Sequence, residues 1–72
     1  MKEKIKVFVN NKLLEVFQGM QVKHALISYD YYLYKSCENG DVIVFDENGF
    51  EIGLDGALHE GAKIYTKNIR EG

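Results

Sequence analysis

Hydrophobic and polar positions alternate strictly in two segments, residues 4–9 near one end of the chain and residues 62–67 near the other. One face of the two segments carries Ile5, Val7, Val9, Ala62 and Ile64. The opposite face carries Lys4, Lys6, Phe8, Lys63, Tyr65 and Lys67. A period of two residues is typical of a strand that buries one face and leaves the other open. We therefore expect a half-buried strand in each segment.

Three further segments have strand character. Residues 13–17 follow Asn10 and Asn11, which tolerate positive φ and suit a tight hairpin turn. Residues 42–45 are β-branched and aromatic, which favours a strand. An Asn-Gly pair just before residues 50–52 predicts a second hairpin with a short returning strand there.

Between these strands, residues 22–29 have the spacing of one helix face. The positions i, i+3, i+4 and i+7 are Val22, Ala25, Leu26 and Tyr29. Asp30 is a suitable N-cap for a further helical turn through residues 31–34. The pattern is compatible with one bent helix or with two separate helices.

The predicted order is therefore two strands, a helix, two strands, a long connection and a last strand. One helix can cover one face of such a sheet, which defines an α+β fold. We expect residues 1–72 to form a single domain with a short flexible tail from about residue 68. The predicted core consists of Ile5, Val7, Val16, Val22, Leu26, Val44, Leu58 and Ile64.

Composition excludes several classes of protein. The chain has 72 residues and one cysteine, Cys37, which excludes an intrachain disulfide and a four-cysteine zinc site. Hydrophobic residues make up 46% of it, but no apolar run is long enough to span a membrane. The first residues also lack the continuous apolar block of a secretory signal. Together with the unpaired cysteine, these features predict a cytoplasmic protein without membrane association.

Candidate catalytic and metal-binding residues are few. His24 and His59 are the only histidines, and we interpret both as surface or half-buried residues and not as metal ligands. Cys37 has no Cys-x-x-Cys partner and lies beside the acidic Glu38, which favours a packing role over a nucleophilic one. No catalytic triad, P-loop or zinc-protease motif is present. We expect no enzymatic activity, and no catalytic residue, metal or cofactor.

Two stretches resemble the ubiquitin-like β-grasp superfamily. The first, at residues 5–26, reads IKVFVNNKLLEVFQGMQVKHAL and is similar to the opening hairpin and helix of that family. The second, at residues 58–67, reads LHEGAKIYTK and is similar to its closing turn and last strand. The resemblance implies a mixed sheet of four to five strands with one main helix packed on one face. It also implies that the first and last strands lie side by side and parallel at the sheet centre.

The resemblance points to a binding function. Ubiquitin-like domains commonly bind partners through the sheet face that the helix leaves open. In the implied topology that face becomes one contiguous patch of two aromatic residues ringed by four lysines. Clustered exposed aromatic residues tend to mark interaction sites. We therefore predict that another protein binds Lys4, Lys6, Phe8, Lys63, Tyr65 and Lys67, although these lysines could instead serve only to keep the face soluble.

Two alternative functions stay open. The sulfur carriers of thiamine and molybdopterin biosynthesis, which share this fold, end in Gly-Gly and are activated at the terminal carboxylate. Here Gly72 is the candidate site of activation, but Glu71 stands where those carriers have glycine. The TGS domains, which also share the fold, associate with nucleic acid. A net charge of −2 argues against nucleic acid here, because phosphate neutralisation supplies most of such affinity.

Four tyrosines lie close together in the sequence, at Tyr29, Tyr31, Tyr32 and Tyr34. A helix cannot bury tyrosines on all of its sides. We expect Tyr29 and Leu33 to complete the core and the other three to be partly exposed. A homodimer that covers this region is a further possibility.

Overall fold

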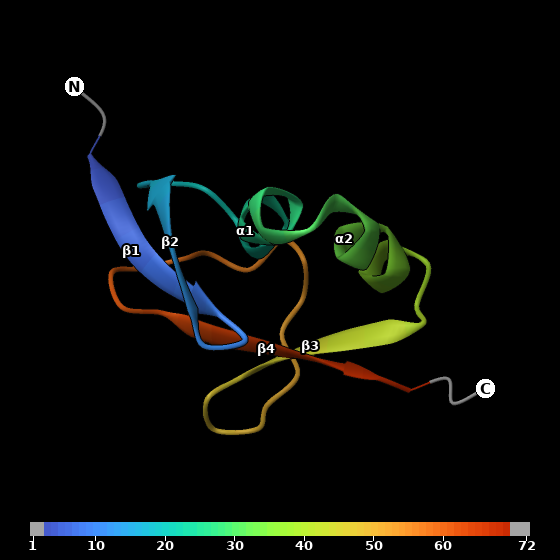
Figure 1. The fold of residues 1–72 in the computed structure, drawn as a ribbon. Helices are drawn as coiled ribbons and strands as arrows, with labels where there is room; N and C mark the ends of the chain where they lie inside the picture. The colour runs from blue at the N-terminus through green and yellow to red at the C-terminus, as the bar shows by residue number, and fades with distance from the viewer. Residues whose placement is uncertain (1–2, 70–72) are drawn as a thin grey trace.

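The computed structural model describes residues 3–69, which form an α+β fold with a four-stranded mixed sheet and two helices (Figure 1). Its elements are β1 (Lys4–Val9), β2 (Lys12–Phe17), α1 (Val22–Tyr29), α2 (Tyr31–Glu38), β3 (Val42–Asp46) and β4 (Lys63–Asn68). The four strands agree with the sequence predictions to within one residue at each end. The α+β class is thus confirmed.

The first hairpin closes through two asparagines in the left-handed conformation. Asn10 has φ 50° and Asn11 has φ 72°, values that asparagine adopts more readily than most residues. Asn10 also reaches β4: its Nδ2 donates to Thr66 Oγ1 at 3.0 Å, and the Thr66 amide donates to Asn10 Oδ1 at 3.0 Å. The turn therefore ties the hairpin to the last strand.

The strand order is β2-β1-β4-β3, with β1 and β4 parallel and adjacent at the centre, as the resemblance implies. Their pairing is short and joins only Phe8 to Lys63 and Val9 to Ile64. The earlier half of β1 is instead met by the segment before β4, where the Gly61 amide donates to the Lys6 carbonyl at 2.6 Å. At the other end, β4 continues through Asn68, one residue into the predicted tail.

The helical region consists of two separate helices, which decides between the two possibilities left open by the sequence. The break falls at Asp30, whose backbone is extended with φ −165°. Its Oδ1 accepts hydrogen bonds from the amides of Tyr32 at 3.0 Å and Leu33 at 3.4 Å, so Asp30 caps α2 as expected. The expectation of one main helix is wrong, because α1 and α2 are eight residues each. Neither helix in this part of the chain could cross a membrane.

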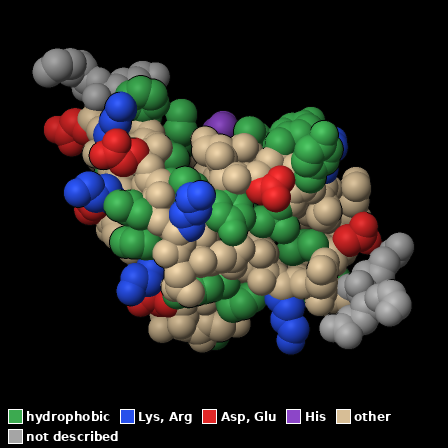
Figure 2. Space-filling view, viewed as in Figure 1, with side chains coloured by type: hydrophobic (Ala, Val, Ile, Leu, Met, Phe, Trp, Pro, Cys, Tyr) green, Lys and Arg blue, Asp and Glu red, His purple; other side chains and the backbone are tan. Residues whose placement is uncertain are grey.

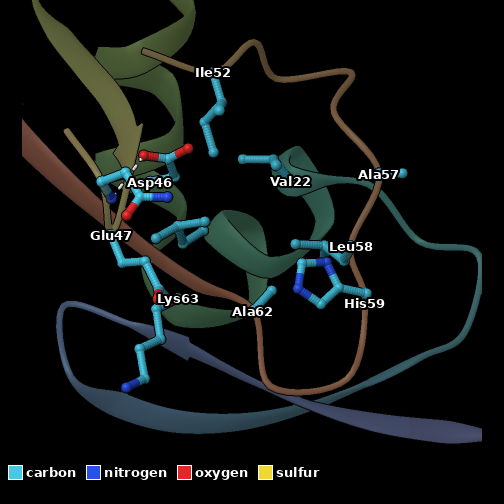
Figure 3. Close-up of a pocket in the computed structure, with 11 residues that line it drawn as sticks. Val22, Asp46, Glu47, Ile52, Ala57, Leu58, His59, Ala62 and Lys63 are labelled. Atoms are coloured by element: carbon cyan, nitrogen blue, oxygen red, sulfur yellow. Dashed lines mark hydrogen bonds between the residues drawn. The ribbon is translucent and has the colours of Figure 1, made fainter. Parts of the chain in front are cut away.

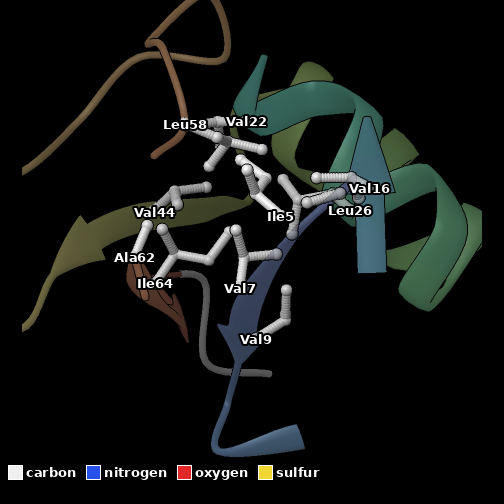
Figure 4. Close-up of a cluster of buried hydrophobic side chains, with 11 residues drawn as sticks. Ile5, Val7, Val9, Val16, Val22, Leu26, Val44, Leu58, Ala62 and Ile64 are labelled. Atoms are coloured by element: carbon white, nitrogen blue, oxygen red, sulfur yellow. The ribbon is translucent and has the colours of Figure 1, made fainter. Parts of the chain in front are cut away.

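The core lies between the sheet and the helices (Figure 4). Leu26 of α1 is fully buried and points at the strands, as Figure 4 shows. The buried set includes all eight residues predicted for it: Ile5, Val7, Val16, Val22, Leu26, Val44, Leu58 and Ile64. Tyr29 and Leu33 pack against this cluster as expected, and Tyr34 and Cys37 join them.

The short strand expected at residues 50–52 is absent from the described sheet, where only an isolated bridge joins Glu51 to Phe45. The returning segment begins beside β3, where the Asp46 amide donates to the Phe50 carbonyl at 2.8 Å. Asp46 Oδ1 accepts from the amides of Asn48 and Phe50, both at 2.9 Å, which closes a compact loop. After that loop the Ile52 amide donates to the Val44 carbonyl, and the chain leaves the sheet edge.

Candidate functional site

One face of the sheet is left open, because both helices pack on the same side of it (Figure 1). Burial alternates along the two central strands as predicted. Lys4 and Lys6 are exposed while Ile5 and Val7 between them are buried. In β4 the buried Ile64 separates the exposed Lys63 from Tyr65. The six predicted residues Lys4, Lys6, Phe8, Lys63, Tyr65 and Lys67 therefore share the open face.

These six residues do not form one compact ring. Because Phe8 pairs with Lys63, Lys4 lies four residues before this pair and Lys67 lies four residues after it. At about 3.3 Å per residue, Lys4 and Lys67 are roughly 26 Å apart along the strands. The idea that four lysines ring two aromatic residues is thus wrong, and its cause is the short overlap of β1 and β4.

A band of large side chains instead runs across all four strands. Leu13 of β2 lies opposite Phe8 of β1, and Phe45 of β3 lies opposite Tyr65 of β4. We call Leu13, Phe8, Tyr65 and Phe45 the aromatic band. The prediction from sequence missed Leu13 and Phe45, although the same alternation, applied to residues 13–17 and 42–45, places both on this face.

The rings of the aromatic band are partly packed against other side chains of the same chain. Tyr65 stacks on Phe45 with ring centroids 5.8 Å apart and an interplanar angle of 23°. Both stacked rings are half-buried, Phe8 is half-buried as well, and Leu13 at the edge is 50% exposed. Side chains held in place lose less rotamer freedom on binding. The band is therefore better ordered than fully exposed aromatics would be.

Two of the four lysines of this face are positioned over rings. Lys63 Nζ lies 6.0 Å from the centroid of Phe8, and Lys4 Nζ lies 5.7 Å from that of Phe17. None of the four lysines of this face forms an ion pair with another residue of the described part of the chain. Among the strand residues on this face, the four lysines outnumber the acid Glu15, which lies opposite Lys6.

A hollow of about 350 Å³ lies beyond the end of the sheet, between the loop after β3 and the segment before β4 (Figure 3). Its apolar wall is formed by Val22, Ile52, Leu58, Ala62 and Ile64. The Asp46 carboxylate and the His59 ring stand on opposite sides of it in Figure 3. Asp46 already accepts two amide hydrogen bonds from the loop, which gives it a structural role. No group of three His, Cys, Asp or Glu side chains within residues 3–69 could hold a metal ion.

His24 and Cys37 have structural roles. His24 Nδ1 accepts a hydrogen bond from the Gln21 amide at 2.9 Å, which satisfies a free N–H at the start of α1. Cys37 packs against the core, and its burial raises the pKa of the thiol. The cause is the loss of water around sulfur, not the charge of Glu38 that the sequence suggested.

Two of the tyrosines are the most exposed rings of the helical side. Tyr31 is 54% exposed and Tyr32 is 81% exposed, whereas Tyr29 and Tyr34 lie against the core. Figure 2 shows hydrophobic side chains gathered at the upper right, over α2. The remaining predicted site, Gly72 with its neighbour Glu71, lies outside the described residues.

Comparison with known proteins identifies no relative. No model of a known protein family matches the chain, and a search of curated proteins gives no significant match. The functional argument therefore depends on the geometry of the open face.

Proposed function

We propose that this chain is a β-grasp domain that binds another protein through its open sheet face. The fold proposal is supported by the order β2-β1-β4-β3 with β1 and β4 parallel, and by the hairpin and closing segments that resemble that superfamily. The presence of a second, equally long helix after α1 is compatible with the proposal, since α2 packs on the same side of the sheet.

The aromatic band carries the functional proposal. It offers the stacked pair Tyr65 and Phe45 and the half-buried Phe8, with Leu13 more exposed at the edge strand. Interfaces gain most of their affinity from a few large anchors of this kind, surrounded by polar residues that exclude water. A partner would cover the band with its own apolar side chains.

The charges of the open face define the partner further. Lys4, Lys6, Lys63 and Lys67 extend from one end of the face to the other without an ionic partner among the described residues. Such charges mainly accelerate association with a surface of opposite sign and set its salt dependence. We infer that the partner presents an apolar centre with acidic residues on two sides of it, because Lys4 and Lys67 lie along the strands on opposite sides of the band.

The test compares variants of the two sides of the molecule. The immobilised chain captures candidate partners from cell extract, and the affinity of each purified partner is measured by calorimetry. Phe8→Ala and Tyr65→Ala should each weaken binding by about 2 kcal/mol, roughly thirtyfold. Tyr32→Ala, on the helical side, is the matched control and should leave the affinity for a partner with a single binding site unchanged.

Charge-reversal variants keep the proposal testable if the aromatic substitutions disturb the fold. Lys63→Glu and Lys67→Glu alter exposed side chains, so the fold should persist. Both should slow association, and the difference from wild type should shrink as salt rises. A partner that binds the folded Phe8/Tyr65 double variant and both charge reversals as tightly as wild type does not use this face, and the proposal is then wrong.

The sulfur-carrier alternative stays a prediction. It depends on Gly72, and the measurement that addresses it is pyrophosphate exchange with ATP and an adenylating enzyme. Glu71→Gly should increase exchange by removing bulk and charge beside the reacting carboxylate. Absence of exchange for wild type and Glu71→Gly alike leaves the binding module as the supported function.

A further inference from the structure

The outward face of α2 has an aromatic first half. Tyr31 and Tyr32 are exposed at 54% and 81%, with their ring centroids 6.1 Å apart and nearly perpendicular. Tyr31 also lies 6.1 Å from Tyr34, which leads along the helix. Two tyrosines exposed side by side present ring faces that the rest of the described chain does not cover.

The second half of the same face is charged but internally neutral. Lys35 and Glu38 follow Tyr31 at i+4 and i+7, so all three lie on one side of the helix. Lys35 Nζ pairs with Glu38 Oε1 at 2.8 Å, and the Tyr34 hydroxyl donates to Glu38 Oε2 at 3.3 Å. The bond from Lys35 keeps the pKa of Glu38 below its usual range. The two charges therefore cancel, and the face has no excess of either sign there.

We propose that this face of α2 binds a second copy of the same chain, with the two α2 helices packed antiparallel about a twofold axis. In that arrangement the tyrosine half of each helix meets the Lys35–Glu38 half of the other. Lys35 of one copy lies over the Tyr31 and Tyr32 rings of the second copy, a cation–π contact. A twofold interface makes this contact twice, because residue i meets j and j meets i.

A second copy suits this face better than an unlike partner for two reasons. The face contains both members of the cation–π pair, one in each half of the helix, so a copy supplies what each half lacks. Because the charges of Lys35 and Glu38 cancel, two copies meet without like-charge repulsion. An acidic partner would instead be attracted by the lysines of the open sheet face. Antiparallel packing adds a favourable alignment of the two helix dipoles.

The dimer would be weak and would leave the open sheet face free. Two exposed tyrosines and their neighbours offer much less than the ~800 Å² per partner of a standard interface, so we expect a dissociation constant of roughly 0.1 mM. Because α2 packs on the opposite side of the sheet from the aromatic band, a dimer displays two aromatic bands. Two linked sites bind a repeated partner more tightly than one.

Sedimentation equilibrium from about 20 µM to about 1 mM, spanning that constant, tests the proposal. The mass should rise with concentration from 8.3 kDa towards twice that value. Tyr31→Ser with Tyr32→Ser should weaken the dimer at least tenfold, and Lys35→Gln should weaken it severalfold. Leu13→Ser, which removes an apolar side chain about as exposed as Tyr31 from the open face, is the matched control and should leave the dimer unchanged.

Two further measurements make the result decisive. Circular dichroism shows whether the tyrosine variant keeps its helices, and Tyr32→Ser alone serves if the double variant does not. A mixture of isotope-labelled and unlabelled chains should give intermolecular contacts between Lys35 and the Tyr31 and Tyr32 rings. A chain that stays monomeric at about 1 mM, or a dimer that Leu13→Ser dissociates and the tyrosine variants do not, overturns the proposal.

Discussion

The open sheet face and the outward face of α2 both carry aromatic side chains. The two faces differ in how far the rings are buried and in whether the charges beside them are paired. On the sheet, Tyr65 is stacked against Phe45 and half-buried, and the nearby lysines have no ionic partner among the described residues. On α2, Tyr32 stands 81% exposed, and the charges beside it are paired with each other. These differences are the basis of our two proposals, an unlike, acidic partner for the sheet face and a second copy for the helix face.

The physical cause of this difference is the spacing of side chains on the two kinds of surface. Residues opposite each other on neighbouring strands are about 5 Å apart, so rings such as those of Phe45 and Tyr65 cover one another. Side chains on a helix diverge from its axis, so the Tyr31 and Tyr32 rings meet edge to face, 6.1 Å apart, and leave most of their surface in water. A tyrosine on the sheet therefore stabilises the fold, whereas a tyrosine on this helix mainly adds exposed ring surface.

The largest expected effect tests whether the two faces belong to one cooperative unit. Leu26 is fully buried in the core between α1 and the sheet. Leu26→Ala should lower the free energy of unfolding by about 2–5 kcal/mol, because it leaves a cavity where the structure relaxes only in part. Urea denaturation followed by helix circular dichroism and by tyrosine fluorescence should give coincident transitions. Separate transitions would show that α2 unfolds independently, and the two faces would then belong to two separate folding units.

A direct comparison of one tyrosine from each face has the next largest effect. Tyr65→Ala should cost about 1–3 kcal/mol, because it removes half-buried area and the stacking on Phe45. Tyr32→Ala should change stability by less than about 0.5 kcal/mol, because the ring is almost fully in water. Tyr65→Phe is the control, since it keeps the stacked ring and should restore most of the loss. Equal costs for Tyr65→Ala and Tyr32→Ala would contradict the contrast between the faces.

The smallest expected effect concerns the inner side of α2, at Cys37. Burial raises the pKa of this thiol, so less thiolate is present at a given pH, and alkylation by iodoacetamide should be slower than in the unfolded chain. The raised pKa stabilises the fold at pH values below the thiol pKa of the unfolded chain. This contribution is lost as pH rises through the pKa of the folded state.

The matched control for Cys37 is Glu38→Gln. Because burial and not the neighbouring charge raises the thiol pKa, the pH profile of alkylation should be the same in this variant. A profile that moves to lower pH in Glu38→Gln would instead assign the shift to the carboxylate.

Local sequence patterns were sufficient to predict most of the strands, turns and helices. The alternation in residues 4–9 predicted β1, the Asn10–Asn11 pair predicted its turn, and Asp30 was recognised as a cap. Each of these depends on contacts within a few residues, which is why a pattern of a few residues reveals them. The prediction of a strand at residues 50–52 was wrong, because a pattern of a few residues reveals only local contacts. A turn signal indicates where the chain reverses, but it does not fix how many residues of the returning segment pair with β3.

The sequence by itself determined which residues face the core and which face outward, because a period of two fixes the face of every residue once a strand forms. Only the tertiary structure decided which outward residues are neighbours. The two-residue overlap of β1 and β4 separated Lys4 from Lys67 and brought Leu13, Phe8, Tyr65 and Phe45 into one band. Strand register depends on contacts between residues more than fifty positions apart, such as Asn10 with Thr66, and no local pattern contains that information.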